Sequence, residues 1–210
     1  MADELIDIYD ENMNHLGTAM KSQAHREGLW HRVFHCWIVN KDSKKVWLQL
    51  RGEDKTIYPN MLDISAAGHL HSGEKPKDGI REIEEELGLT VNVDKLTKLF
   101  TRLLVQEDTG LCNREFCSTY VLETDKSLED VKMQPEEVDG IYETDIDDII
   151  NLMKGKVEFV TLVGYRRNQD NSYTKEVRSA ALKNFLPHGK DYYIKVMEML
   201  KRYCEGCLEL

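Results

Sequence analysis

Short apolar or alternating stretches run through the first half of the chain, and they have the pattern of β-strands. Residues 45–50 (KVWLQL) alternate with a two-residue period, while residues 5–8 and 33–39 are apolar and rich in β-branched and aromatic side chains. The polar link at residues 40–44 (NKDSK) predicts a hairpin that joins the strands on either side of it.

Residues 62–67 form another candidate strand, and after the loop that follows them the apolar period changes to that of a helix. Pro76 suits the first turn of a helix, and the apolar residues within 80–87 fall on one face. Gly88 can take the left-handed conformation that ends a helix. The sequence therefore predicts a helix that begins near Pro76 and stops at Gly88.

The rest of the chain continues with alternating and helical patterns. The expected strands are residues 96–105, 115–122 and 140–143, and the expected helices are residues 145–153, 174–184 and 192–204. No internal repeat and no long linker interrupts this order. We therefore expect an α/β fold in one domain over residues 1–210, with a helical extension at the C-terminal end.

Composition narrows the class of protein. Hydrophobic residues make up 41% of the 210-residue chain and charged residues 31%, which is typical of a globular domain. The formal net charge of −10 opposes binding to nucleic-acid polymers or to anionic lipid, and it suits a divalent cation better. No apolar run approaches the roughly 20 residues of a bilayer span, and the first residues are acidic, so we expect a cytoplasmic protein that does not bind a membrane.

The five cysteines are expected to be reduced, because their number is odd and no export signal is visible. Cys204 and Cys207 form a single CxxC pair. A structural zinc site needs a second pair or histidine ligands nearby in the sequence, and neither is present.

Three glutamates on the predicted helix are the first candidates for chemistry. Glu82, Glu85 and Glu86 stand at positions i, i+3 and i+4, so their carboxylates share one face of the helix. Like charges so placed repel each other unless a cation lies between them, and hard oxygen ligands are those that Mg²⁺ or Mn²⁺ prefers. A solvated acidic face, with Arg81 paired to Glu85, is the alternative interpretation.

The loop before the helix decides between the two interpretations, because the whole segment resembles the box of the Nudix family. That box has the pattern G-x5-E-x7-R-E-U-x-E-E-x-G-U, in which U is an apolar residue. Its nine specified places are filled by Gly68, Glu74, Arg81, Glu82, Ile83, Glu85, Glu86, Gly88 and Leu89. One difference is present: six residues, not seven, separate Glu74 from Arg81.

The resemblance implies a Nudix α/β/α sandwich, with a mixed sheet between helices. It also implies that Glu82, Glu85 and Glu86 bind Mg²⁺ or Mn²⁺, with the carbonyl of Ala67 or Gly68 as a further ligand. Arg81 and Glu74 would pair and hold the loop to the helix, with Gly68 and Gly88 as the other structural positions of the box.

The activity implied by this resemblance is hydrolysis of a diphosphate linkage in a small-molecule substrate. Metal ions would neutralise charge in the transition state and make a bound water acidic enough to attack phosphorus. The family pattern does not fix the general base, which stays open among Glu82, Glu85 and Glu115.

Outside the box the chain resembles the isopentenyl-diphosphate isomerase branch of the same superfamily, over roughly residues 5–150. The segments that carry this likeness are Gly17-Thr18-Ala19, His25, residues 29–32, residues 48–51, Lys55, Pro59 and residues 63–69. By the resemblance, Arg51 and Lys55 hold the diphosphate. His25, His31 and His69 match a histidine trio that binds metal in the isomerase, and Glu115 matches one of its glutamates. We expect His31 and His69 to contact metal or phosphate.

Two departures favour hydrolysis over isomerisation. The isomerase has a catalytic cysteine two residues before the last of these histidines, and this chain has Ala67 there, which can neither give nor take a proton. Asn113 stands where a second glutamate is expected. An isomerase, and a Nudix module that binds a ligand without turnover, remain as alternatives.

Substrate identity and oligomeric state are left open by the sequence. Substrate choice is expected to depend on residues 54–60 and 162–173, which lie outside the box. The apolar positions of the helix that starts near Asp191 suit either packing within the chain or pairing in a homodimer.

Overall fold

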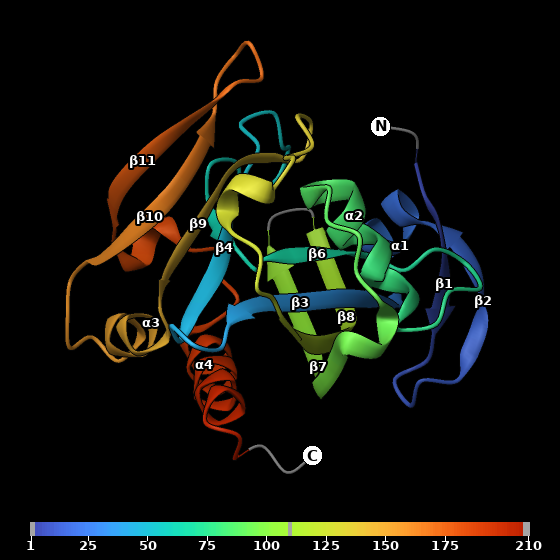
Figure 1. Cartoon of the computed structure of the whole chain (residues 1–210). Helices are drawn as coiled ribbons and strands as arrows, with labels where there is room; N and C mark the ends of the chain where they lie inside the picture. The colour runs from blue at the N-terminus through green and yellow to red at the C-terminus, as the bar shows by residue number, and fades with distance from the viewer. Residues whose placement is uncertain (1–2, 109–110, 208–210) are drawn as a thin grey trace.

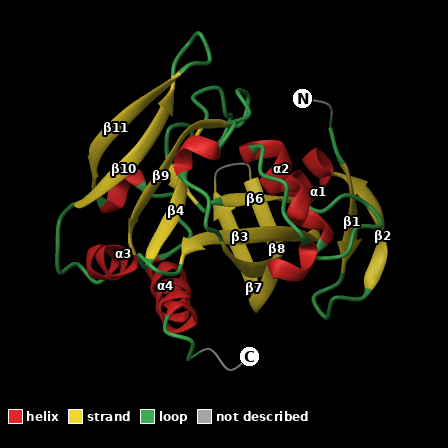
Figure 2. Ribbon diagram, in the orientation of Figure 1, coloured by secondary structure: helices red, strands yellow, loops and turns green. Residues whose placement is uncertain are grey.

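The computed structural model describes residues 3–108 and 111–207. Within these residues, eleven strands join in one mixed sheet, and four α-helices cover it (Figures 1 and 2). The strands are β1 (Leu5–Tyr9), β2 (His15–Met20), β3 (Trp30–Asn40), β4 (Lys45–Arg51), β5 (Leu62–Asp63), β6 (Ala66–His69), β7 (Leu96–Asp108), β8 (Leu111–Glu123), β9 (Val138–Asp145), β10 (Val160–Arg167) and β11 (Tyr173–Ala180). The helices are α1 (Lys21–Glu27), α2 (Arg81–Leu87), α3 (Ile146–Met153) and α4 (Lys190–Cys204).

The long strand β3 organises the sheet. It pairs in parallel with β8 and antiparallel with β4, β6 and β1. Its side chains alternate between two cores: Phe34 packs in the core that contains residues of α2, and Trp37 in the core that contains residues of α3 and α4. The sheet is therefore buried between helices on both faces, as expected for an α/β/α sandwich.

The strand pairs predicted from the alternation are confirmed. Val39 lies opposite Val46 and Asn40 opposite Lys45, so β3 and β4 form the expected hairpin. The second expected pair is β7 and β8: β7 begins where predicted and ends later, and β8 is longer than predicted at both ends.

The stretch 62–67 is two short strands where we predicted one. β5 pairs with β4, and β6 pairs with β3, so the chain crosses from one strand to the other within four residues. Ser65 lies at the crossing, where its hydroxyl donates to the carbonyl of Trp47 at 2.6 Å and accepts from the amide of Ile38 at 2.9 Å. This side chain satisfies the backbone groups that the diverging strands leave free.

The predicted helix over residues 174–184 is wrong. Tyr173–Ala180 is strand β11, antiparallel to β10, and only Leu182–Asn184 is helical, as a 3-10 turn. The exposed side chains of β11 include Thr174 and Lys175, and exposed polar and charged residues are common on an edge strand. Pairing with β10 determines this conformation, and the sequence pattern does not reveal that partner.

The start of the box helix also differs from the prediction. A 3-10 turn occupies Asp78–Ile80, and the α-helix begins only at Arg81. Gly79 packs so closely on Phe34 of β3 that an added Cβ would overlap that ring. The end is as predicted, because Gly88 caps α2 with a φ of 65° in the left-handed region.

The C-terminal helix α4 lies beside α3 and extends away from the sheet at the lower end of the molecule in Figure 1. Tyr193, Val196 and Leu200 are buried on its inner face, in agreement with the predicted helical pattern. Among the described residues, no helix combines the length and apolar character that crossing a bilayer requires.

Candidate functional site

The box helix touches strand β6 at a glycine. The carboxylate of Glu82 lies directly against Gly68, where any Cβ would overlap it. One turn further along α2, Glu86 Oε2 accepts a hydrogen bond of 3.3 Å from the amide of Ala67. Two carboxylates of α2 therefore reach the backbone of Ala67 and Gly68, the pair expected to supply a carbonyl ligand.

Both carboxylates are held in poorly solvated surroundings. Burial raises the pKa of Glu82 to about 7, although Arg81 favours the ionised form. Burial likewise raises the pKa of Glu86 well above its usual range, and the neighbouring charge of Glu82 adds to the effect while Lys55 opposes it. Two largely buried carboxylates that repel each other, beside the backbone of β6, are a hard-oxygen donor set that fits Mg²⁺ or Mn²⁺.

The third box glutamate does not converge with these two. The side chain of Glu85 is 51% exposed, and its Oε2 is 3.0 Å from Nη1 of Arg81. The helix thus presents one buried carboxylate, one that is largely buried and one that is exposed at the surface.

Arg81 joins the loop, the helix and β6. Its Nε donates to Glu74 Oε1 at 2.8 Å, and its Nη2 donates to the carbonyl of His69 at 2.8 Å. The Glu74–Arg81 contact implied by the resemblance is therefore present although one residue is missing between them. The tight 3-10 turn at Asp78–Ile80 fits the shorter connection, because this helix advances further per residue than an α-helix.

A second group of polar side chains gathers around His69, the last residue of β6. Among the described residues, His25, His31, His69 and Glu115 each offer one ligand atom, and these atoms lie within 4.8 Å of one another. They come from α1, β3, β6 and β8, and the pairing of His31 with Glu115 across β3 and β8 sets two of them side by side. The histidine trio, recognised only through the resemblance, is thus assembled by four separate elements.

The three imidazoles are suited to a cation. Burial lowers the pKa of His25 to about 4 and lowers the pKa values of His31 and His69 as well, so all three are neutral near pH 7. His31 Nδ1 is 2.8 Å from the carbonyl of Leu29. Its buried Nε2 has no hydrogen-bond partner in the part of the chain that the structure describes. When Nδ1 donates to the Leu29 carbonyl, Nε2 carries the lone pair, and this lone pair can bind a metal ion.

Glu115 is an interior residue of the sheet. Strand β8 lies between β3 and β7, and Glu115 is 6% exposed. Asn113, where a second glutamate was expected, donates to Glu115 Oε1 at 2.5 Å. It therefore orients this carboxylate.

Arg51 and Lys55, the candidates for holding a diphosphate, both contact protein groups. Arg51 donates to the carbonyls of Ile57 and Tyr58 and to Asp63 at 3.1 Å. Lys55 forms an ion pair with Glu137. The charge of Lys55 also affects Glu86, so this lysine lies near the carboxylates of α2.

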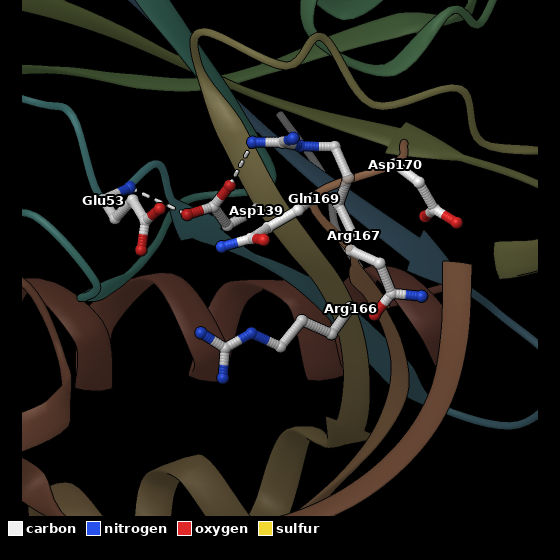
Figure 3. A pocket seen from close by; sticks show the side chains of 7 residues that line it. Glu53, Asp139, Arg166, Arg167, Gln169 and Asp170 are labelled. Carbon is white, nitrogen blue, oxygen red and sulfur yellow. Dashed lines mark hydrogen bonds and ion pairs between the residues drawn. The ribbon is translucent and has the colours of Figure 1, made fainter. Parts of the chain in front are cut away.

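A polar hollow of about 530 Å³ lies at the second of the two segments expected to influence substrate choice, and residues 54–60 of the first segment do not line it (Figure 3). Glu53 flanks the first segment, and Arg166 and Arg167 come from the second, the end of β10. Asp139 connects them, because it accepts from the amide of Glu53 at 2.8 Å and pairs with Arg167 at 2.5 Å. The hollow therefore joins the second segment to Glu53, the residue just before the first.

A further group was not foreseen: His35, Glu115 and Cys117 also have ligand atoms within 4.8 Å of one another. No spacing in the sequence points to it. The register of β3 against β8 creates it, because His35 and Cys117 lie on the same face of adjacent strands.

Comparison with known proteins agrees with these observations. The NUDIX domain family matches residues 29–163. An uncharacterized Nudix hydrolase of Clostridium acetobutylicum is 33% identical over 205 residues, which is 95% of this chain and 98% of that protein. An isopentenyl-diphosphate delta-isomerase of Photorhabdus laumondii is 30% identical over 161 residues, 75% of this chain and 89% of that protein.

Solved structures support the fold. The crystal structure of DR0079 from Deinococcus radiodurans superposes with a TM-score of 0.54, at 24% identity, over 72% of this chain and 90% of that one. At this identity the likeness shows a shared architecture and carries no statement about substrate.

Proposed function

The chain belongs to the Nudix family and is an enzyme of the Nudix hydrolase type, and from this premise we propose that it hydrolyses a diphosphate linkage with Mg²⁺ or Mn²⁺. The observation that carries the proposal is the position of Glu82 and Glu86, which lie side by side and largely buried against the backbone of Gly68 and Ala67. Removing two ionised carboxylates from water costs free energy unless a cation lies between them.

In this proposal Glu82 and Glu86 hold the cation together with a carbonyl of β6, and Glu85 turns inward from the solvent to join them. When bound, the cation supplies charge neutralisation for the diphosphate and acidifies a water. Glu82, Glu85 and Glu115 remain the candidates for accepting the proton of that water.

The basic residues have a separate role. Lys55 lies within electrostatic reach of Glu86, and we propose that an arriving diphosphate replaces Glu137 as its partner. Arg51 holds the carbonyls of residues 57 and 58, so it shapes the loop on that side of the substrate. His31 and His69 would contact a metal or a phosphate oxygen from the opposite side.

Isopentenyl-diphosphate isomerisation is the second candidate, and the histidine cluster with Glu115 favours it. Ala67 opposes it, because the position two residues before His69 on β6 has no group that can move a proton. Hydrolysis needs no such group at this position.

One assay separates the candidates. Nucleoside triphosphates, nucleotide sugars, dinucleotide cofactors and isopentenyl diphosphate are each incubated with the protein, with Mg²⁺ or with chelator, and phosphorylated products are measured. Cleavage that requires Mg²⁺ supports a hydrolase and begins to identify the substrate. Conversion of isopentenyl to dimethylallyl diphosphate without phosphate release would establish the isomerase instead.

We also propose the compartment and the partners of the protein. We expect it to work in the cytoplasm on a small molecule, without a nucleic-acid polymer or a membrane as partner. Whether it forms a homodimer is a separate question that gel filtration answers.

A further inference from the structure

Cys117 lies in the interior of the sheet, on the face that α4 covers. It is a free, buried thiol on β8, and its Sγ–H donates to Glu115 Oε2 at 3.3 Å. The other oxygen, Oε1, is 3.9 Å from Nε2 of His31. The two oxygens of one carboxylate thus face two different groups, the thiol on one side and the histidine cluster on the other.

His35 completes the group on the thiol side. It lies two strand residues beyond Val33, which pairs with Cys117, and a ring nitrogen of His35 is within 4.8 Å of the ligand atoms of Cys117 and Glu115. Its Nδ1 is 2.9 Å from the hydroxyl of Tyr192 on α4. A hydrogen bond to one imidazole nitrogen fixes the ring and leaves the other nitrogen for a cation, as is usual behind metal-binding histidines.

The tyrosine that holds His35 also lines a hollow in the surface. A hollow of about 750 Å³ is lined by Phe100, Arg102, His188 and Tyr192, among others. Arg102 on β7 pairs in register with Cys117, and its guanidinium lies 4.4 Å from the centre of the Tyr192 ring. The hollow therefore opens beside the tyrosine that orients His35.

We propose that His35, Cys117 and Glu115 form a binding site for a thiophilic divalent cation of the Zn²⁺ type, separate from the carboxylates of α2. Imidazole, thiolate and carboxylate are a ligand set that selects such ions, whereas Mg²⁺ prefers oxygen alone. Three protein ligands leave one position open for water or a substrate oxygen. Glu115 bridges this ion to whatever the histidine cluster binds, one oxygen to each.

Binding has a defined proton balance. The Cys117 thiol gives its proton to the solvent as sulfur becomes a ligand, and Glu115 loses the hydrogen bond from that thiol. The histidine needs no change of charge, because burial keeps the pKa of His35 well below its usual value.

The test uses Co²⁺ as a spectroscopic substitute for Zn²⁺. The Cys207→Ser variant is the parent, because it removes the Cys204–Cys207 pair as a second source of thiolate. After treatment with chelator the protein is titrated with Co²⁺, and the sulfur-to-cobalt charge-transfer absorption in the near ultraviolet is recorded. We expect this absorption in the parent and its loss in Cys117→Ser, where an oxygen still bonds to Glu115.

Cys36→Ala is the matched control, because Cys36 is buried on β3 but packs in the core on the α2 side. It should keep the absorption. Tyr192→Phe should keep it as well but weaken Zn²⁺ binding by about tenfold, the effect typical of residues behind a ligand. Absence of the absorption in the folded parent, or its persistence in Cys117→Ser, would overturn the proposal. Neither result bears on hydrolysis by the α2 carboxylates.

Discussion

Glu82 and Glu84 are two residues apart on α2 and lie in opposite surroundings. The side chain of Glu82 is 12% exposed and lies against Gly68, whereas Glu84 is exposed and accepts a hydrogen bond from Thr90. Of the two, only Glu82 lies where it could bind a metal ion, so the same substitution at Glu82 and at Glu84 separates metal binding from a general effect on the helix.

We expect Glu82→Gln to lower Mg²⁺-dependent turnover by more than about 100-fold, because residues that merely support metal ligands already contribute 10- to 100-fold. Glu84→Gln should leave turnover within about twofold. Steady-state rates of both variants at saturating Mg²⁺ test this expectation. Normal activity in Glu82→Gln, or an equal loss in both variants, would remove the metal assignment.

Glu85→Gln tests the exposed member of the trio. If Glu85 joins the cation, this variant loses Mg²⁺-dependent turnover while its thermal stability without metal stays unchanged, since its carboxylate is half exposed. If it keeps full turnover, Glu85 serves only as the partner of Arg81.

The raised pKa of Glu82 predicts how stability depends on pH without metal. The pKa of about 7 in the folded protein exceeds the ordinary glutamate pKa of 4.5, so the protonated group stabilises the fold below pH 4.5, and this contribution is lost as the pH rises through 7. The loss is of order 3 kcal/mol. Denaturant unfolding between pH 4.5 and 8 should show this slope, and Glu82→Gln should reduce it. A slope that Glu82→Gln leaves unchanged would contradict the assignment.

At the scale of elements, the contact between α2 and β6 positions the candidate metal site. Gly68 allows the approach, and Arg81 fixes it by bonding both Glu74 and the carbonyl of His69. The shortened loop is accommodated by the 3-10 turn before Arg81, so the ligand helix keeps its position although the connection to it is irregular.

Gly68→Ala should displace the Glu82 carboxylate, because the added Cβ overlaps a group at the end of a flexible side chain. We expect weaker Mg²⁺ binding with only a small change in thermal stability, measured by calorimetric titration and melting. Gly73→Ala is the control: it has open space, but its φ of 85° disfavours a side chain, so it should cost about 1 kcal/mol of stability and leave Mg²⁺ affinity unchanged.

At the scale of the whole molecule, α4 closes the core on the face opposite α2. Its residues pack with α3 and with Trp37 of β3 in one cluster of buried side chains. Tyr192 in the same helix is hydrogen-bonded to His35. The packing of this C-terminal helix therefore also positions a polar side chain of β3.

Leu200→Ala should therefore destabilise the protein by about 2–5 kcal/mol, the range for a large-to-small change in a packed core. Glu198→Ala, on the exposed side of α4, should change stability by less than about 0.5 kcal/mol. Urea unfolding followed by circular dichroism and by tryptophan fluorescence measures both. Coincident transitions would support one domain over the whole chain, and two separate transitions would contradict it.

The sequence by itself determined the box helix, its cap at Gly88, the β3–β4 and β7–β8 pairs and the family. These features depend on local period, on turn chemistry and on a motif of contiguous residues. Only the tertiary structure decided that Tyr173–Ala180 is a strand, that Glu85 points to solvent, and that His35 and Cys117 meet Glu115. The strand and the cluster depend on the register between strands far apart in the sequence, and the exposure of Glu85 depends on how α2 packs against β6. Pairing partners and burial, not local propensity, fix which side chains come together.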